Sequence, residues 1–434
     1  MAGVSDKELL KLRGFPRGID NISPETSVRP DALRAARNVD IDDAGKMRRR
    51  SGSTKVSNTP GMHSLYSHER AEFMLAVVPA GLTMIDDTLL PLTLAPVARF
   101  ADHMSFETAE HHIFASNGHE SFRVSLDGAV SAFSPPQPGG QPTVNVNTVA
   151  GGLYAGEYQV AVTFLDAFNR ESGSTLSTII DVPEGGGITL TAIPQDAAAV
   201  RVNIYMSAAN GDVLYLADTI PVGSGTYLLG RRTLGRALDK QFLVPLPPCQ
   251  HLMLQNGIMH GAVKNIHVWS EALNYGLYNP AINCATYNAD ITLIARMGSA
   301  GQAGTFVSAG QRTYYMSGAS PTDWQRVIAH PYGAVPHTLV YVTASDLELD
   351  VEGVVPVWMD TRGELIAGLP GGRVQRLHKA TYAGPIDLES GASAMVERDG
   401  IRQLLTVVQG GQVNQFTATD SVDAVVCRNG VIVG

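Results

Sequence analysis

From Gly61 onward the sequence is a succession of short apolar runs separated by polar turns, and this pattern limits what the chain can fold into. The first runs cover residues 73–78, 82–85, 112–115, 122–126 and 130–133. Runs this short have the length of β-strands and are too short for helices. Asn117-Gly118 and Asp127-Gly128 separate successive runs and predict two-residue type I′ hairpins. The pattern predicts antiparallel meanders in series.

Composition supports a mostly β chain. Charged residues make up only 17% of the 434 residues, whereas Gly (44) and Pro (24) are frequent, as expected for short strands joined by tight turns. A chain of this length predicts two or three domains. No apolar run approaches the roughly 20 residues of a membrane span and no signal-peptide pattern opens the chain, so we expect a protein made and kept in the cytosol before assembly. Cys249, Cys284 and Cys427 have no metal-type spacing and are expected to be isolated, buried thiols.

Two proline-rich stretches predict domain boundaries. Residues 135–142 and 245–248 can form neither helix nor central strand. Between them, residues 156–164 and 200–205 alternate large apolar side chains with smaller or polar ones, which predicts a β-sandwich of immunoglobulin or fibronectin type III kind. The expected organisation is an N-terminal segment (residues 1–60), a first meander part (61–141), an inserted sandwich (142–245) and the remaining meander (246–434).

The N-terminal segment carries a cluster of basic residues. Pro30, Asp31 and the alanines that follow predict a short helix over residues 30–38. Val39 and Ile41 alternate with aspartates, which predicts a strand that enters a turn at residues 43–45. Lys46 and residues 48–50, all arginine, follow this turn. A cluster of this kind is most often solvated, and otherwise contacts phosphate or another subunit.

Residues 14–56 contain a recognisable motif, which reads Gly-Phe-Pro-Arg-Gly-Ile-Asp-Asn-Ile-Ser-Pro-Glu at its start and Val-Asp-Ile-Asp-Asp-Ala-Gly-Lys-Met-Arg-Arg-Arg-Ser-Gly near its end. It resembles the N-terminal signature of the tail nozzle proteins of short-tailed bacteriophages, also called tubular protein B or tail hub proteins. Residues 266–271, 274–280, 305–318, 331–336 and 355–368 resemble propeller blades of this family. Residues 153–229 resemble a sandwich inserted in some of its members.

The resemblance implies an all-β fold, a β-propeller interrupted by an immunoglobulin or fibronectin III-like β-sandwich. It implies a virion structural protein of the phage tail that is assembled in the host cytoplasm. Copies of the chain would form a ring around the DNA exit channel, and the family resemblance implies a hexamer. The expected partners are further copies of the chain, portal and adaptor proteins, tail fibres or spikes, and double-stranded DNA in transit. Five arginines are candidate assembly contacts: Arg34, Arg37, Arg48, Arg49 and Arg50.

The net charge of −9 disfavours a protein that grips nucleic acid, since such binding depends on Lys and Arg, but it suits a channel through which DNA slides. Four acids alternate with apolar residues and would share one face of a strand, as in a half-buried edge strand or a channel lining: Asp346, Glu348, Asp350 and Glu352. A catalytic carboxylate pair is the enzymatic alternative, because propellers host glycosidases. The other readings left open are a receptor- or carbohydrate-binding tail protein and, more distantly, a tail glycan hydrolase.

No catalytic, cofactor or metal site is predicted. His111 and His112 are adjacent, so on a strand they would point to opposite faces and could not bind one ion together. Trp269 and Trp358 lie in apolar runs and are expected in the core, whereas Trp324 is in a more open segment that could stack on a sugar. We therefore expect a protein that is not an enzyme and has no cofactor.

Overall fold

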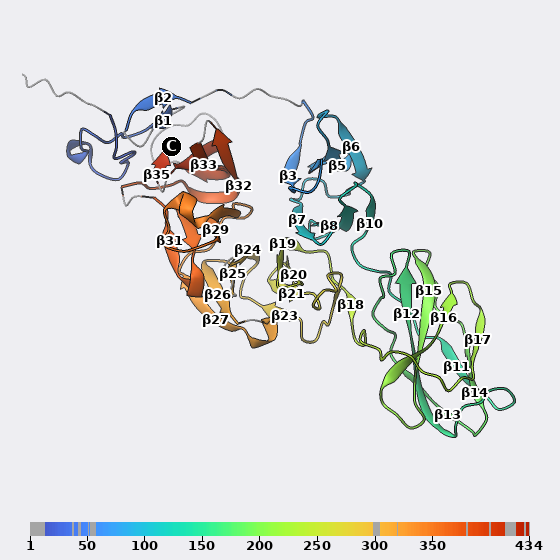
Figure 1. Ribbon diagram of the computed structural model, residues 1–434. Helices are drawn as coiled ribbons and strands as arrows, with labels where there is room; N and C mark the ends of the chain where they lie inside the picture. Colours follow the sequence, from blue (N-terminus) through green and yellow to red (C-terminus); the bar gives the residue numbers. More distant parts are fainter. Residues whose placement is uncertain are drawn as a thin grey trace, which may run out of the picture. The chain divides into compact units, whose positions relative to one another are not determined.

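The computed structural model is an all-β protein (Figure 1). It describes residues 14–36, 39–41, 45–50, 52, 58–297, 304–318, 320–378, 381–398, 401–412, 422–428 and 431–433. The chain forms two compact units, Met1–Asn58 with Tyr287–Gly434, and Thr59–Thr286. Helical structure in the described residues is limited to short 3-10 turns: η1 (Glu25–Ser27), η2 (Pro321–Asp323), η3 (Ala344–Leu347) and η4 (Pro370–Gly372). None of the described helices is long and apolar enough to cross a membrane.

Seven four-stranded antiparallel sheets occur among the described residues, and six of them follow the chain order strand by strand or nearly so, as the blades of a β-propeller do. Three lie in the Thr59–Thr286 unit. The first sheet has β3 (His63–Ser67), β4 (Met74–Val78), β5 (Gly81–Ile85) and β6 (Pro91–Ala95). The second has β7 (Ser105–Ala109), β8 (His112–Ser116), β9 (Ser121–Ser125) and β10 (Val130–Ala132). The third has β19 (Gln250–Gln255), β20 (Ile258–Val263), β21 (Ile266–Trp269) and β23 (Cys284–Thr286).

The other three such sheets lie in the unit that contains both chain ends. They are β24 (Ile291–Arg296), β25 (Gly304–Ala309), β26 (Arg312–Ser317) and β27 (Gln325–His330); β28 (Val340–Thr343), β29 (Val354–Met359), β30 (Leu365–Gly368) and β31 (Val374–Arg376); and β32 (Ile386–Arg398), β33 (Ile401–Gln412), β34 (Val422–Arg428) and β35 (Val431–Val433). One continuous core joins these sheets, with Phe306, Trp358 and Leu404 each contributed by a different sheet. Trp269 and Trp358 are buried, as predicted.

The central strands of these sheets are buried on both faces. In β8, Ile113 and Ala115 pack with Leu75 of the preceding sheet, while Phe114, which points the other way, packs with Met259 of the sheet that follows the insert. Successive residues of a strand face opposite sides, so both faces of this sheet are covered by a neighbouring sheet. This explains why the runs are continuously apolar and do not alternate.

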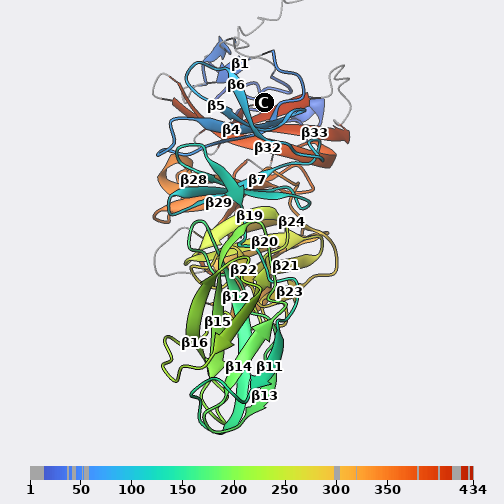
Figure 2. The same ribbon diagram turned by 90° about the vertical axis from the view of Figure 1, so that its right-hand side faces the viewer.

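The insert between β10 and β19 has two sheets that face one another across its own core (Figure 2). The first sheet has β14 (Gly187–Thr191) between β11 (Thr143–Asn147) and β17 (Thr226–Leu229), and the second has the order β13 (Thr178–Val182), β12 (Gly156–Asp166), β15 (Ala199–Ser207) and β16 (Leu214–Pro221). Val162 and Phe164 of β12 pack against Ile188 and Leu190 of β14 in this core. The predicted alternation of residues 156–164 therefore gives a sandwich strand.

The chain enters and leaves the insert at one point of the neighbouring sheet. The Ser134 hydroxyl and the Leu246 N–H both donate to the carbonyl of Gly276, at 2.7 and 2.8 Å. Beyond the insert, β18 (Val244–Pro245) pairs with β22 (Leu277–Tyr278) and continues the same attachment. The two ends of the insert are therefore close together in space.

The N-terminal segment contains the predicted strand but not the predicted helix. β1 (Val39–Ile41) pairs with β2 (Met47–Arg49), while the turn residues Asp43 and Ala44 lie outside the described part. The helix expected over residues 30–38 is wrong for its described residues. Leu33 instead forms a β-bridge with Ile19 and exchanges backbone hydrogen bonds with Gly18 and Asp20. These contacts with residues distant in sequence outweigh the local helix propensity.

The predicted hairpins β8–β9 and β9–β10 are present, but their turns differ in type. β8 ends at Ser116 and β9 begins at Ser121, so a longer loop replaces the two-residue type I′ turn. A type I′ turn requires a positive φ at both central residues. In the two dipeptides here, only the glycines have one, +85° at Gly118 and +90° at Gly128. The Asn117 side chain explains the first case, because its Oδ1 accepts from the N–H groups of His119 and Glu120 and stabilises the longer loop.

Replacing residues 138–243 with a short Gly-Ser linker should leave the rest of the protein folded. The chain ends left by the deletion meet at Gly276, and the insert has a separate core, so few stabilising contacts are lost. Circular dichroism should show retained β structure and a cooperative melt, and residues 138–243 alone should also fold. An insoluble or non-cooperative remainder would show that the insert is an integral part of the fold.

Candidate functional site

The candidate assembly arginines have different environments. Arg48 and Arg49 are exposed neighbours on β2, so they project from opposite faces of the β1–β2 ribbon. Arg50 instead forms an ion pair with Asp40, with 3.3 Å between Nε and Oδ1. Arg34 donates to the carbonyls of Asp20 and Ser23, and Arg37 lies outside the described residues. Arg34 and Arg50 thus have structural partners within the segment, which leaves Arg48 and Arg49 as the better candidates for contact with another subunit.

The four acids predicted on one strand face are not on a strand, and that expectation is wrong. Residues 344–347 form η3, and Glu348 follows with φ of +53°. These residues form a tight turn between β28 and β29, and Leu347 and Leu349 are both buried. The apolar residues of the alternating pattern are therefore buried by a turn and not by a strand. Asp346 accepts two hydrogen bonds of 2.9 Å from Arg402, and Glu348, Asp350 and Glu352 are exposed. A channel-lining role for these acids stays a prediction, without a shared strand face to support it.

No group of three or more potential metal ligands occurs among the described residues. Cys249 is buried as expected, but Cys284 is exposed, and the side chain of Cys427 lies outside the described part. Cys284 is on β23, the outer strand of its sheet, and this position accounts for its exposure. Trp324 is partly buried.

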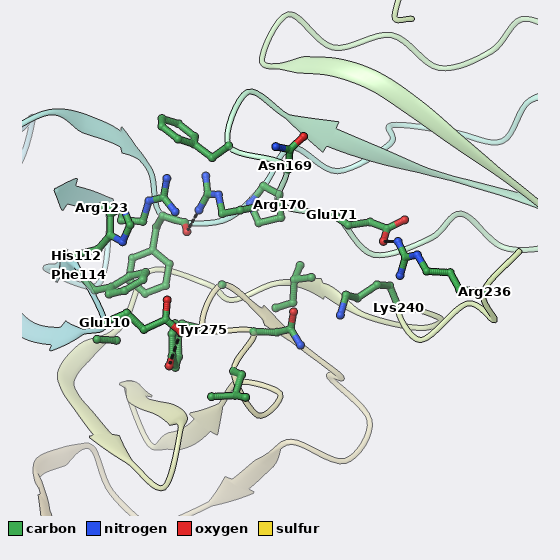
Figure 3. Close-up of a pocket in the computed structure, with 18 residues that line it drawn as sticks. Glu110, His112, Phe114, Arg123, Asn169, Arg170, Glu171, Arg236, Lys240 and Tyr275 are labelled. Carbon is green, nitrogen blue, oxygen red and sulfur yellow. Dashed lines mark hydrogen bonds and ion pairs between the residues drawn. The ribbon is translucent and has the colours of Figure 1, made fainter. Parts of the chain in front are cut away.

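A pocket of about 630 Å³ lies where the insert meets the sheets β7–β10 and β19–β23 (Figure 3). Residues from six separate stretches of the chain line it: Glu110, His112, Phe114, Arg123, Phe133, Phe168, Asn169, Arg170, Glu171, Arg236, Lys240, Asn274 and Tyr275. Four of these are cationic and several are aromatic. The pocket was not predicted from the sequence, because its residues form no motif and meet only through the docking of the insert.

Arg170 attaches the insert to the β7–β10 sheet. It follows the turn after β12, where its Nε donates to Asp166 Oδ2 at 2.7 Å. Its Nη1 and Nη2 donate to the carbonyls of Phe133 and Ala132 at 2.8 and 3.0 Å. Three of its five guanidinium N–H groups make these hydrogen bonds, and two of the three hold the end of β10. These charge-assisted hydrogen bonds place the turn at residues 166–170 over the pocket.

Arg123, on β9, lies beside Arg170, and Figure 3 shows the two guanidinium groups next to one another. Arg123 is only 6% exposed, and burial together with the charge of Arg170 lowers its pKa to about 10. Its Nε donates to the Ser131 hydroxyl at 3.0 Å, and its Cζ lies 4.6 Å from the centroid of the Phe168 ring. Nη2 is buried and has no hydrogen-bond partner among the described residues. Arg123 is thus a buried cation without a matching anion of its own.

His112 and Glu110 border the same end of the pocket. Burial lowers the pKa of His112, and the charges of Arg123 and Arg170 lower it further, so the imidazole is neutral at pH 7. The Tyr275 hydroxyl donates to Glu110 Oε1 over 3.4 Å, a long contact at the exposed rim. At the other end, Lys240 is largely buried and contacts the exposed Asp239 at 3.3 Å. Figure 3 shows Lys240 directed toward the pocket.

Glu171 is the best-paired charge of the pocket. Its Oε1 accepts hydrogen bonds of 2.6 to 2.7 Å from Thr163, Asn203 and Tyr205, and its Oε2 is paired with Arg236. Burial alone would raise the pKa of the carboxyl, but these donors favour the charged form more strongly, and the net effect is a lowered pKa. The carboxylate therefore stays ionised and unites β12, β15 and the segment after β17.

No protein-family model and no curated protein sequence matches this chain. Among solved structures, it is similar to PorZ, an essential bacterial surface component of the type-IX secretion system of human oral-microbiomic Porphyromonas gingivalis, with 11% identity and a TM-score of 0.26 over 89% of this chain. The chain spans 55% of the length of that protein. The WD40 domain of SCAP from fission yeast has 10% identity and a TM-score of 0.19, with 85% and 87% of the two chains covered.

The AfRom2 CNH domain has 8% identity and a TM-score of 0.18, with 70% of this chain and 92% of that chain covered. Similarities this low carry no information on function. The fold assignment therefore stands on the sheets themselves: an all-β protein with four-stranded antiparallel sheets, consistent with a β-propeller.

Substituting Glu171 with Gln should destabilise the insert by about 3 kcal/mol at pH 7, because Arg236 and the hydroxyl donors lose a buried anion. A carboxyl whose pKa is lowered by folding stabilises the fold above its unfolded pKa, and this contribution is lost as the pH falls through the folded pKa. The difference in the free energy of unfolding between parent and variant should therefore shrink as the pH falls below 4.5, the ordinary pKa of a glutamate carboxyl.

Urea unfolding of residues 138–243, followed by circular dichroism at pH 7 and pH 3, measures this difference. Glu157→Gln is the matched control, because Glu157 is an exposed carboxylate of the insert on β12, and it should change stability by less than about 0.5 kcal/mol at either pH. If the free energies of unfolding of the parent and the Glu171→Gln variant differed by the same amount at both pH values, Glu171 would not be charged at pH 7.

Proposed function

We propose that this protein is a structural component of a bacteriophage tail, a nozzle that forms a ring below the portal and adaptor proteins. The observation that carries the proposal is the resemblance of residues 14–56 to the N-terminal signature of tail nozzle proteins. The described part of that segment adds support, since its β1–β2 ribbon presents two unpaired, exposed arginines, Arg48 and Arg49, as a subunit or adaptor contact would require.

The architecture is compatible with this proposal. The six meander sheets would be blades of one β-propeller, which the immunoglobulin or fibronectin III-like sandwich interrupts between β10 and β19. Propeller blades cover one another on both faces, and the burial of Ile113 and Phe114 in two different cores fits such stacking. An insert attached at one end, through the carbonyl of Gly276 and the hydrogen bonds of Arg170, would leave the rest of its surface for contact with other tail proteins.

In this proposal the protein acts mechanically and electrostatically. Six copies would surround the DNA channel, retain the genome before infection and support fibres or spikes on the outer surface. The net charge of −9 keeps non-specific adhesion to duplex DNA weak, which suits a conduit through which DNA must move quickly. The chemistry required of the chain is assembly and passage, without a catalysed reaction.

Negative-stain electron microscopy of the purified protein, alone and with tail proteins, tests the proposal. The expected images are rings with six-fold symmetry and a central hole. The purified protein should also fail to bind duplex DNA at micromolar concentration in physiological salt. A protein that remains a monomer under all assembly conditions, or that binds DNA tightly, is not a nozzle of this kind.

Reversing the charge of Arg48 and Arg49 to Glu should prevent ring formation without unfolding the monomer. Both side chains are exposed and unpaired among the described residues, so their replacement costs little folding free energy, whereas like charges across a subunit contact repel. The fraction of rings by analytical ultracentrifugation, with the melting temperature, measures both effects. Arg231→Glu, an exposed arginine of the insert, is the control and should assemble normally. Normal assembly of the double variant would assign the contact to other residues.

A further inference from the structure

The pocket beneath the insert has an electrostatic imbalance that the protein itself does not correct. Arg123 and Arg170 are adjacent cations, and the nearest carboxylate, Asp166, is committed to Arg170. Arg123 has a single side-chain hydrogen bond, to Ser131, and its buried Nη2 is unsatisfied within the described chain. A buried charge without a partner is costly, and a neighbouring like charge increases the cost. An anion placed between the two guanidinium groups would pair with the buried charge and reduce the repulsion between the two cations.

The geometry of the free N–H groups of Arg123 indicates which class of anion would bind. With Nε engaged by Ser131, the remaining N–H groups of Arg123 form the planar fork that binds carboxylate or phosphate oxygens. His112 is neutral in this environment, so it can offer an N–H without adding to the repulsion between the arginines. Lys240, at the other end of the pocket, adds a further positive charge.

The rest of the lining indicates what carries the anion. Phe168 and Tyr275 present aromatic rings, which pack on the C–H faces of small rings, while Asn169, Asn274 and Glu110 offer acceptors or donors for hydroxyl groups. A volume of about 630 Å³ accommodates one or two sugar units. This combination of cationic groups, aromatic walls and further polar side chains is typical of a site for a polar, ring-shaped compound.

We propose that this pocket binds one acidic sugar unit, with its carboxylate or phosphate against Arg123 and Arg170 and its ring between Phe168 and Tyr275. Nη2 of Arg123 is buried, and the Phe168 ring lies over the same guanidinium with its centroid 4.6 Å from Cζ, so we expect this ring to shift when the ligand binds. Phe168 is 58% exposed and lies on the turn at residues 166–170, so its side chain has room to rotate. The inference concerns the insert and its attachment, and it does not depend on ring assembly.

Hydrogen exchange of the full-length protein with glucuronate, glucose 6-phosphate and glucose tests the site directly. The two anionic sugars should protect residues 121–133 and 166–171, with Kd of about 1 mM or tighter, and glucose should bind at least tenfold more weakly. The tighter of the two anions identifies a carboxylate or a phosphate as the natural group. Equal protection by glucose, or no protection of these segments at about 10 mM of either anion, overturns the proposal.

Substitution of Arg123 separates the charge from the shape of the site. Arg123→Gln should weaken glucuronate binding at least tenfold, and Arg123→Lys, which keeps the charge but not the fork, should weaken it to a smaller extent. Arg231→Gln removes an exposed arginine outside the pocket and should bind as the parent does. Parent-like affinity of a folded Arg123→Gln protein would overturn the assignment. Should that variant fail to fold, the protection pattern of the parent protein still decides the question.

Discussion

The structure depends on one constraint: a four-stranded sheet whose central strand is apolar on both faces cannot be stable by itself. β8 illustrates it, because Ile113 and Phe114 are successive residues that belong to two different cores. Each sheet therefore needs a neighbour on each side, and such sheets are stable only as members of a stack. The unit that contains both chain ends meets the same constraint with one core that runs through three sheets and centres on Trp358. Continuous apolar runs, short strands and tight turns all follow from this requirement.

The insert meets a different constraint, since a sandwich covers its own apolar faces and needs little from the sheets beside it. Its attachment is accordingly polar, through the Gly276 carbonyl and the hydrogen bonds of Arg170 to the end of β10. The pocket lies where the insert meets these sheets. Arg170 has two consequences there: it anchors the insert, and its charge makes the environment of Arg123 more unfavourable.

Strand positions were largely predictable from the sequence, because apolar runs such as residues 73–78 and 82–85 report burial directly. Local sequence patterns gave wrong predictions where contacts with residues distant in the sequence determine the backbone conformation. Leu33 pairs with Ile19 and so leaves the helix that Pro30 and the alanines favour. The alternation around Leu347 and Leu349 fits a strand equally well, and only the core against which both leucines pack selects the turn. The pocket could not be predicted, since Arg123 looks like any strand arginine until residues 166–171 are placed over it.

Arg123 is the point where stability and function can be weighed against one another. A strand that packs against an insert needs only an apolar side chain at this position, and a long apolar residue would fill the space beside Phe168 without a desolvation cost. Stacking on Phe168 and one hydrogen bond to Ser131 recover part of that cost but leave Nη2 unsatisfied. Departures of this kind from a well-packed interface concentrate at binding sites, where the ligand supplies the missing partner. The unsatisfied cation is therefore better explained by a ligand than by the packing of the fold.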